Sequence, residues 1–276
     1  MRNTFDGTYF KHQKGGRTVA LIAGTSAGNH AFIQIITNEF SHCLNYPAPD
    51  HTPGDIIRVG GSIFSLNGVS LDIEGKDISV RGEIGYAGQT PLRYDVMGPF
   101  RYLPMQCRHR IHSLHHRLCG SLAICGEYID FTGGTGYIEG DSGISFPRSY
   151  MWVQCNDFPE KACIMASVAD IPLAGLRFRG CVCVVWLGGV EYRLATYLGV
   201  KILHCDENRV VLKQGSLCLE INIAGGTGHA LAAPVQGEMA GEINERIVCG
   251  AQFRFMKGGK VLFEQHSENA SFEYVG

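Results

Sequence analysis

The chain has 276 residues and carries 24 Lys and Arg against 26 Asp and Glu, a formal net charge of -2. A hydrophobic content of 45% and a charged content of 18% are typical of a compact fold and exclude a disordered chain. The pI near 6.6 and the absence of a basic run predict that nucleic acid is not a partner.

The opening stretch, MRNTFDGTYFKHQKGG, lacks the apolar core of a secretory signal. No uncharged apolar run reaches the ~18 residues of a membrane span. We therefore expect a cytoplasmic protein without stable membrane insertion. The 11 cysteines include no CxxC pair, and the stretch CRHRIHSLHHRLC (107–119) lacks the paired ligand spacing of structural zinc. We therefore expect the cysteines to be reduced thiols, and we expect the protein to bind neither a metal nor a cofactor.

Short segments rich in Val, Ile and Phe, each bounded by Gly, Asn or Asp, follow one another along the chain and predict strands. They are RTVALIAG (17–24), HAFIQIIT (30–37), GDIIRVGGSIFSL (54–66), VSLDIEG (69–75), DISVRGEIGY (77–86), CGSLAICGEYIDF (119–131) and RVVLKQGSLCLEINI (209–223). One strand per ~8 to 12 residues is typical of a β-barrel or sandwich.

Two segments interrupt this pattern. RYLPMQCRHRIHSLHHRL (101–118) could be taken for a helix, but Pro104 and the alternation of arginines with His109 and Ile111 favour extended chain. NDFPEKACIMASVADIPLAGLRFRG (156–180) is interpreted as a break between two β units. We predict an all-β fold of two antiparallel β-barrel units packed together, spanning residues 1–158 and 159–276.

The stretch YIEGDSGISFP (137–147) places Glu139 and Asp141 one residue apart. In a strand, residues i and i+2 point to the same face, so both carboxylates and Tyr137 would share one volume. A paired-acid site in a pocket is one interpretation. A solvated turn with two surface acids is the other, and the residues alone leave both open.

Several segments resemble the tocopherol cyclase-like family in the same order along nearly the whole chain. They are FDGTYFKHQ (5–13), GPFRYLPMQCRH (98–109), YIEGDSGISFPRSYMWVQCNDF (137–158), LATYLGVKI (194–202) and LAAPVQGEM (231–239). YIEGDSG is more distantly similar to a signature of the carotenoid hydratases. The resemblance implies two lipocalin-like β units. Two tryptophans of the family pattern are Thr8 and Ser142 here, so the substrate does not carry over.

The resemblance also implies chemistry at an isolated C=C bond, which needs a carboxylic acid held protonated in an apolar cavity. Glu139 aligns with the proton donor, and Asp141 would favour its protonation by like-charge repulsion. His109 would lie opposite as base or water activator, and Tyr137 would hydrogen-bond the acid or a substrate oxygen. For His109, a surface or structural role among the neighbouring histidines stays open.

A second group is predicted to contact the substrate. Trp152, Gln154 and Asn156 alternate in YMWVQCNDF, so they share one face of a strand, as in a ligand pocket with a few orienting amides. Core packing for Trp152 and backbone satisfaction for the amides are the alternatives. Arg108 points away from His109 and is a candidate ion-pair partner. Tyr9 shares a face with Lys11, whose expected position is exposed.

Other motifs are discounted. The glycine-rich GGTGYIEG and AGGTG precede no helical pattern, so they predict no phosphate loop. GDSG is typical of serine proteases, but the residues around Ser142 match the cyclase-like pattern instead. Two hypotheses remain: a cofactor-independent enzyme (cyclase, hydratase or isomerase) that protonates an unsaturated hydrophobic molecule such as a prenylated phenol, or a non-catalytic lipocalin-like carrier or sensor. The oligomeric state is open.

Overall fold

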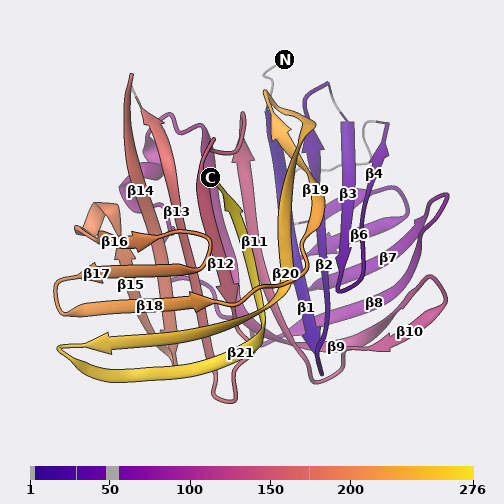
Figure 1. Ribbon diagram of the computed structural model, residues 1–276. Coiled ribbons are helices and arrows are strands. Elements are labelled where there is room, and N and C mark those ends of the chain that lie inside the picture. Colours follow the sequence, from indigo (N-terminus) through magenta and orange to yellow (C-terminus); the bar gives the residue numbers. More distant parts are fainter. Residues whose placement is uncertain (1–3, 29, 48–55, 174) are drawn as a thin grey trace. The chain divides into compact units, whose positions relative to one another are not determined.

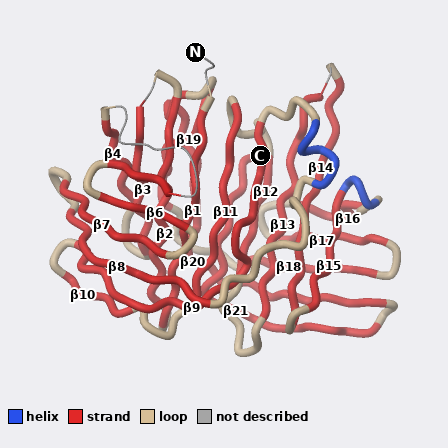
Figure 2. The backbone as a smooth tube through the Cα atoms, turned by 180° about the vertical axis from the view of Figure 1, so that it is seen from behind, coloured by secondary structure: helices blue, strands red, loops and turns tan. Residues whose placement is uncertain are grey.

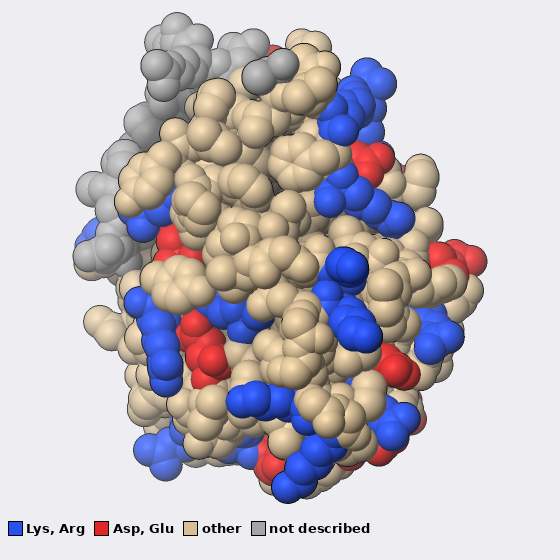
Figure 3. Space-filling model, turned by 90° about the vertical axis from the view of Figure 1, so that its left-hand side faces the viewer, with Lys and Arg blue, Asp and Glu red and all other residues tan. Residues whose placement is uncertain are grey.

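The computed structural model describes residues 4–28, 30–47, 56–173 and 175–276. Most of this chain is β-strand, and the helical segments in Figure 2 are two short turns, η1 (Gly98–Tyr102) and η2 (Thr196–Leu198). Within the described ranges, no helix is long and apolar enough to cross a membrane. On the face drawn in Figure 3, basic and acidic side chains are both scattered among uncharged ones.

The strands form two antiparallel sheets. The first runs, in spatial order, β4 (Ser41–Tyr46), β3 (His30–Thr37), β2 (Arg17–Ser26), β1 (Phe5–Lys14), β11 (Thr135–Gly143), β9 (Cys107–Ile124), β8 (Ser79–Ala87), β7 (Gly68–Glu74), β6 (Ser62–Ser65) and β5 (Ile56–Val59), with β10 (Glu127–Asp130) paired to β9. Figure 1 shows β1 and β11, far apart in sequence, side by side at its centre.

The second sheet runs β15 (Val190–Ala195), β14 (Leu176–Leu187), β13 (Ala162–Leu173), β12 (Tyr150–Cys155), β21 (Lys260–Val275), β20 (Glu238–Lys257), β18 (Leu217–Ile223), β17 (Arg209–Gln214) and β16 (Lys201–Cys205), with β19 (His229–Val235) paired to β20. In each sheet, the first strand in the sequence pairs with a strand that comes much later in the sequence. These pairs are β1 with β11 and β12 with β21.

Pairs of glycines close the tightest hairpins. Gly15 and Gly16 connect β1 to β2 with φ of +56° and +80°, and Gly258 and Gly259 connect β20 to β21 with φ of +59° and +79°. A two-residue hairpin whose central residues both have positive φ matches the twist of its flanking strands, and glycine adopts that backbone at no steric cost. The register of both hairpins follows from these sequence positions.

The described chain divides into two compact units that are discontinuous in sequence. Unit 1 holds residues 1–92, 109–146 and 231–242, and unit 2 holds residues 93–108, 147–230 and 243–276. This grouping differs from the predicted division after residue 158, because segments on either side of that position return to the other unit.

Unit 1 has an apolar core on one side of β1 and β11. Phe10 and Ile138, which face each other across these strands, belong to it. Its larger members are Phe10, Val19, Leu21, Ile33, Phe64, Leu118, Phe131 and Ile138. Because side chains alternate along a strand, Tyr9 and Glu139 project from the opposite side, which we term the second face.

The second face of unit 1 is covered in part by a segment from far along the chain. The side-chain amide of Gln34 on β3 donates to the carbonyl oxygen of Ala232 at 3.0 Å and accepts from its N–H at 2.9 Å. At the hairpin tip, Gly237 accepts a hydrogen bond from the N–H of Ala27 and donates one to the carbonyl oxygen of Ile144. Residues 231–242 are thereby fixed on unit 1 (Figure 1).

Unit 2 has its own apolar core, formed by Val153, Ile164, Val185, Leu212, Phe253, Phe255 and Phe272 among others. These residues come from strands on both sides of β12 and β21, so the sheet curves around them. Burying several aromatic rings and branched side chains removes a large apolar area from water, which is the main stabilising contribution to such a unit.

The predicted all-β class with two antiparallel units is confirmed. The interpretation of residues 101–118 as extended chain is confirmed from Cys107 onward, where β9 begins. In the segment 156–180, interpreted as a break between the units, β13 and the start of β14 form regular strands. Five consecutive residues from Ala162 are buried, so both faces of that strand are covered and the expected alternation is absent. Residues 54 and 55 of one predicted strand lie outside the described residues.

Candidate active site

The candidate site lies on the second face of unit 1, where β1 and β11 pair. Tyr9 is directly opposite Glu139, and Lys11 is directly opposite Tyr137. Directly opposed residues of an antiparallel pair project from the same side of the sheet. Four side chains with ionisable groups therefore project together from two neighbouring strands, and all four are buried.

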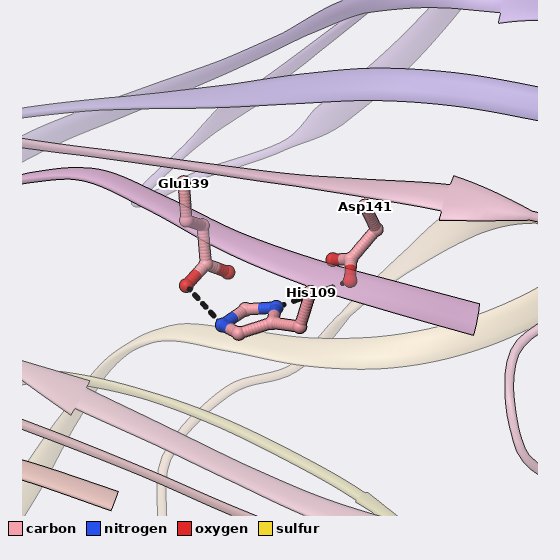
Figure 4. A group of neighbouring side chains, drawn as sticks. All are labelled: His109, Glu139 and Asp141. Atoms are coloured by element: carbon pink, nitrogen blue, oxygen red, sulfur yellow. Dashed lines mark hydrogen bonds and ion pairs between the residues drawn. The ribbon is translucent and has the colours of Figure 1, made fainter. Parts of the chain in front are cut away.

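His109, contributed by the neighbouring strand β9, lies between the two predicted acids (Figure 4). Its Nδ1 is 3.0 Å from Oδ1 of Asp141 with hydrogen-bond geometry. Its Nε2 is 3.3 Å from Oε2 of Glu139, an ion pair whose alignment is poorer than that of a hydrogen bond. The acids are thus bridged by an imidazole, which the alternation of β11 alone does not reveal.

Tyr137 extends the group of Glu139, His109 and Asp141 into a row of four side chains. Its hydroxyl donates a hydrogen bond of 2.6 Å to Oε2 of Glu139, so the predicted contact between these two residues is present. Oε2 of Glu139 thus accepts the hydrogen bond from Tyr137 and also faces Nε2 of His109. Glu139 is consequently oriented from two sides, and its side chain is only 7% exposed.

The charge of His109 follows from its surroundings. Burial lowers the pKa of His109, but the negative charges of Asp141 and Glu139, with their hydrogen bonds, outweigh burial and hold that pKa well above its ordinary value of 6.5. His109 is therefore an imidazolium at neutral pH. It adds stability below pH 6.5, and that contribution is lost as the pH rises through the pKa of the folded state.

We expect Asp141→Asn to lower the titration midpoint of His109 by about one pH unit or more, because it removes one of the two negative charges that favour the imidazolium. Nuclear magnetic resonance of protein labelled with ¹⁵N-histidine, assigned with His109→Gln, measures the midpoint. Asp206→Asn, which removes the exposed partner of His204, is the matched control. An unchanged His109 midpoint in Asp141→Asn would contradict the bridged arrangement.

The remaining predicted residues belong to unit 2. Trp152, Gln154 and Asn156 are buried in unit 2, where Trp152 and Gln154 lie on β12. The core of that unit takes Met151, Val153 and Cys155, so Trp152 and Gln154 project from the other side of β12. Arg108 is exposed and precedes His109 on β9. Their roles in substrate binding stay predictions.

Lys11 is the site residue that sequence reasoning missed. Its expected position was exposed, and this prediction is wrong, because the side chain is fully buried. Strand β1 is central in its sheet and is covered on both sides, so even its charged member is enclosed. The available signal was the pair of aromatic residues, Tyr9 and Phe10, directly before Lys11, since adjacent large apolar side chains point to both faces of a strand and indicate burial on both.

His109, Glu139 and Asp141 also form a described group that could hold a metal ion, since one ligand atom from each lies within 4.8 Å of the others. A metal would need a neutral imidazole nitrogen and both carboxylates at about 2.0–2.2 Å. In the present arrangement, each ring nitrogen of His109 faces a different carboxylate. Metal binding would therefore displace the proton that His109 carries at neutral pH.

A separate buried group lies on the core side of unit 1. Nε2 of His12 is 2.6 Å from the hydroxyl of Tyr86, whose ring centroid is 4.5 Å from that of His116. Nδ1 of His116 is 3.1 Å from Oγ of Ser113. The ring of His116 packs over Gly136, where any side chain would collide with it. These residues face the apolar core and belong to the interior of unit 1.

Comparison with known proteins places the fold. The sequence matches no protein-family model and no curated protein. Among solved structures, kievitone hydratase from Nectria haematococca aligns with a TM-score of 0.57 and 12% identity, over 98% of this chain and 88% of that one. CghA aligns with a TM-score of 0.61 and 8% identity, over 99% of this chain and 88% of the CghA chain. The structure of CghA with Sch210972 aligns with a TM-score of 0.61 and 9% identity, over 99% of this chain and 89% of that one.

These likenesses define the class of fold. The chain has the all-β, lipocalin-like architecture of two antiparallel β units that was predicted. Identities this low show a shared fold and do not transfer a substrate. Membership of the tocopherol cyclase-like family stays a prediction, since no family model matches.

Proposed function

We propose that the protein is a cofactor-independent enzyme that protonates a C=C bond of an unsaturated hydrophobic small molecule, such as a prenylated phenol. Cyclisation, hydration or isomerisation would follow. The observation that carries the proposal is the row of Tyr137, Glu139, His109 and Asp141 on the second face of unit 1, in which Tyr137 and Glu139 are buried and His109 and Asp141 are partly buried. Among its fold neighbours, the name of kievitone hydratase describes a hydratase.

The surroundings of this row suit an apolar substrate. Ile22 lies opposite Tyr9, and Phe32 and Ile36 follow on β3 along the same side of the sheet. Binding sites for such molecules combine apolar walls with a few polar groups that converge on the reacting atoms. Exclusion of water by these walls would protect a carbocation from side reactions.

The proton steps can be written with each bond accounted for. The His109 imidazolium passes its proton to the Glu139 carboxylate, and the carboxylic acid so formed donates that proton to one alkene carbon. The π electrons form the new C–H bond, and the other carbon becomes a carbocation. Water or a phenol oxygen donates an electron pair to the cation, and its proton returns to the Glu139 carboxylate. His109 is already protonated at neutral pH, so it orients Glu139 and supplies protons to it. The predicted role of His109 as a base in the resting enzyme is not part of this proposal.

The test uses heavy water. The protein is incubated in D₂O with a panel of prenylated hydroquinones, prenylated phenols and polyenes. After back-exchange, the masses of the products are measured by mass spectrometry. One retained, non-exchangeable deuterium supports the proposal. Ligands that raise the melting temperature without any deuterium incorporation would instead support the lipocalin-like carrier or sensor.

A further inference from the structure

Three large apolar side chains of unit 2 are exposed. Leu176 begins β14 and is 74% exposed, Tyr102 ends η1 and is 79% exposed, and Leu198 ends η2 and is 44% exposed. All three lie in segments of the same unit. Single exposed apolar residues are common on any protein, whereas a continuous exposed patch marks an interaction surface. Whether these three side chains lie together therefore decides what they mean.

Aromatic rings connect the three segments. The ring centroid of Phe178 on β14 is 6.0 Å from that of Phe100 in η1, and the centroid of Phe100 is 6.0 Å from that of Tyr197 in η2. These rings are themselves only partly buried. Each has an exposed apolar neighbour one or two residues away in the chain, namely Leu176, Tyr102 and Leu198. Together these side chains form one apolar surface, which we term the η1 patch.

The η1 patch is held on unit 2 by buried polar contacts. Nη1 of Arg193 donates to the carbonyl oxygen of Asp95 at 3.1 Å, and the hydroxyl of Tyr197 donates to that of Val96 at 3.0 Å. Arg193 is itself paired with Glu191 at 2.7 Å, and both side chains are 5% exposed. The residues before η1 are therefore fixed, so a partner would meet a preformed surface that needs little ordering.

Basic side chains flank the η1 patch. Arg177 follows Leu176 on β14 and is exposed. Arg101 precedes Tyr102, and its guanidinium carbon lies 5.2 Å from the centroid of that ring. The acid beside Arg101 is Asp95, whose carboxylate is 3.9 Å away, so this ion pair is at its outer limit and weak. Each of these two apolar residues thus has an arginine as its immediate neighbour.

Further charged residues lie on the neighbouring strands of unit 2. Lys201 begins β16 shortly after η2, and it lies opposite Lys213 on β17, with both side chains exposed. Arg179 is offset by Asp170, its direct partner on β13. Asp206, which follows the far end of β16, is engaged by a histidine. Figure 3 faces the left-hand side of Figure 1, where β14 and β16 lie, and it shows basic side chains set among uncharged ones.

We propose that the η1 patch docks the protein reversibly on an anionic lipid membrane. Leu176, Tyr102 and Leu198 enter the boundary between headgroups and acyl chains, and Arg177 and Arg101 contact lipid phosphates. Tyrosine favours this boundary, and apolar side chains flanked by basic ones are the combination that an anionic membrane attracts. Docking does not depend on the proposed chemistry. It would bring an enzyme for apolar molecules to the phase in which such molecules dissolve.

The test measures binding to vesicles of phosphatidylcholine mixed with phosphatidylserine, by flotation in a density gradient at low salt. The variant that combines Leu176→Ser with Tyr102→Ser should bind about tenfold more weakly, because it loses apolar area that the membrane would bury. Arg177→Gln should bind about fivefold more weakly, and added salt should reduce that difference. Tyr128→Ser and Arg58→Gln are the matched controls, since both residues are exposed on unit 1.

Equal vesicle binding by the combined variant and the unchanged protein would overturn the proposal, as would a lack of binding by the unchanged protein. Leu176→Trp gives a second readout, since its fluorescence should shift to shorter wavelength when the mixed vesicles are added. Self-association that the combined variant abolishes, seen by analytical ultracentrifugation without any vesicle binding, would assign the patch to a second copy of the chain instead. These readouts need no substrate, so absence of turnover would count against the proposed function alone.

Discussion

Glu139→Gln should reduce deuterium incorporation into an alkene substrate by about 100-fold or more, since general acid catalysis contributes roughly 10²–10⁴-fold. Glutamine keeps the size of the side chain and can still accept the hydrogen bond from Tyr137. It has no proton of carboxylic acidity to give to an alkene carbon. The fold should persist, because the amide fills the same buried space.

Mass spectrometry of products formed in D₂O measures this loss, with circular dichroism as the check of folding. Glu83→Gln is the matched control, because Glu83 is an exposed glutamate on β8 that accepts a hydrogen bond from Ser70. Equal turnover by Glu139→Gln and the unchanged protein would remove Glu139 from the chemistry. The two-unit fold would stand unaffected by that result.

Acidification from pH 7 to pH 4 should destabilise the protein through His12 and His116. Burial lowers the pKa of His12 to about 4, and burial together with the neighbouring histidines lowers that of His116 to about 3. Unfolded histidines take up protons as the pH falls through 6.5, whereas these two stay neutral in the folded chain. Proton uptake thus favours unfolding, by about 3 kcal/mol for each histidine at pH 4.

Urea denaturation at a series of pH values, with His12→Gln and His116→Gln, checks this prediction. Glutamine does not titrate, so each variant should show a shallower loss of stability between pH 6.5 and pH 4. His109 does not compensate, since its raised pKa gives a contribution that is already complete below pH 6.5. His204→Gln is the exposed control. A slope that neither buried substitution changes would contradict the role of this cluster.

The sequence predicted those features that depend on local pattern. Alternation of Val, Ile and Phe between glycine turns predicted the all-β class, because a strand's two faces meet different surroundings. The spacing of Tyr137, Glu139 and Asp141 predicted that they project together, and the hydrogen bond between Tyr137 and Glu139 agrees with this. Such inferences need nothing beyond the repeat of two residues in a strand.

Features that depend on pairing between distant strands could not be read in the same way. The resemblance placed His109 opposite the acid, but the contact of each ring nitrogen with a different carboxylate depends on how β9 lies beside β11. The burial of Lys11 depends on what covers both sides of β1. Strand β13 escaped detection because burial on both faces removes the alternation by which strands are recognised.

The discontinuity of unit 1 has a consequence for biosynthesis. Residues 231–242, whose hairpin tip bonds to Ala27 and Ile144, leave the ribosome after residues 93–108 and 147–230 of unit 2, with residues 243–276 of that unit still to follow. A nascent chain therefore holds β1 and β11 for a long interval with part of the Glu139 side uncovered. We expect unit 1 to become protease-resistant late in translation, and chains that stop before residue 231 to be the ones that chaperones retain.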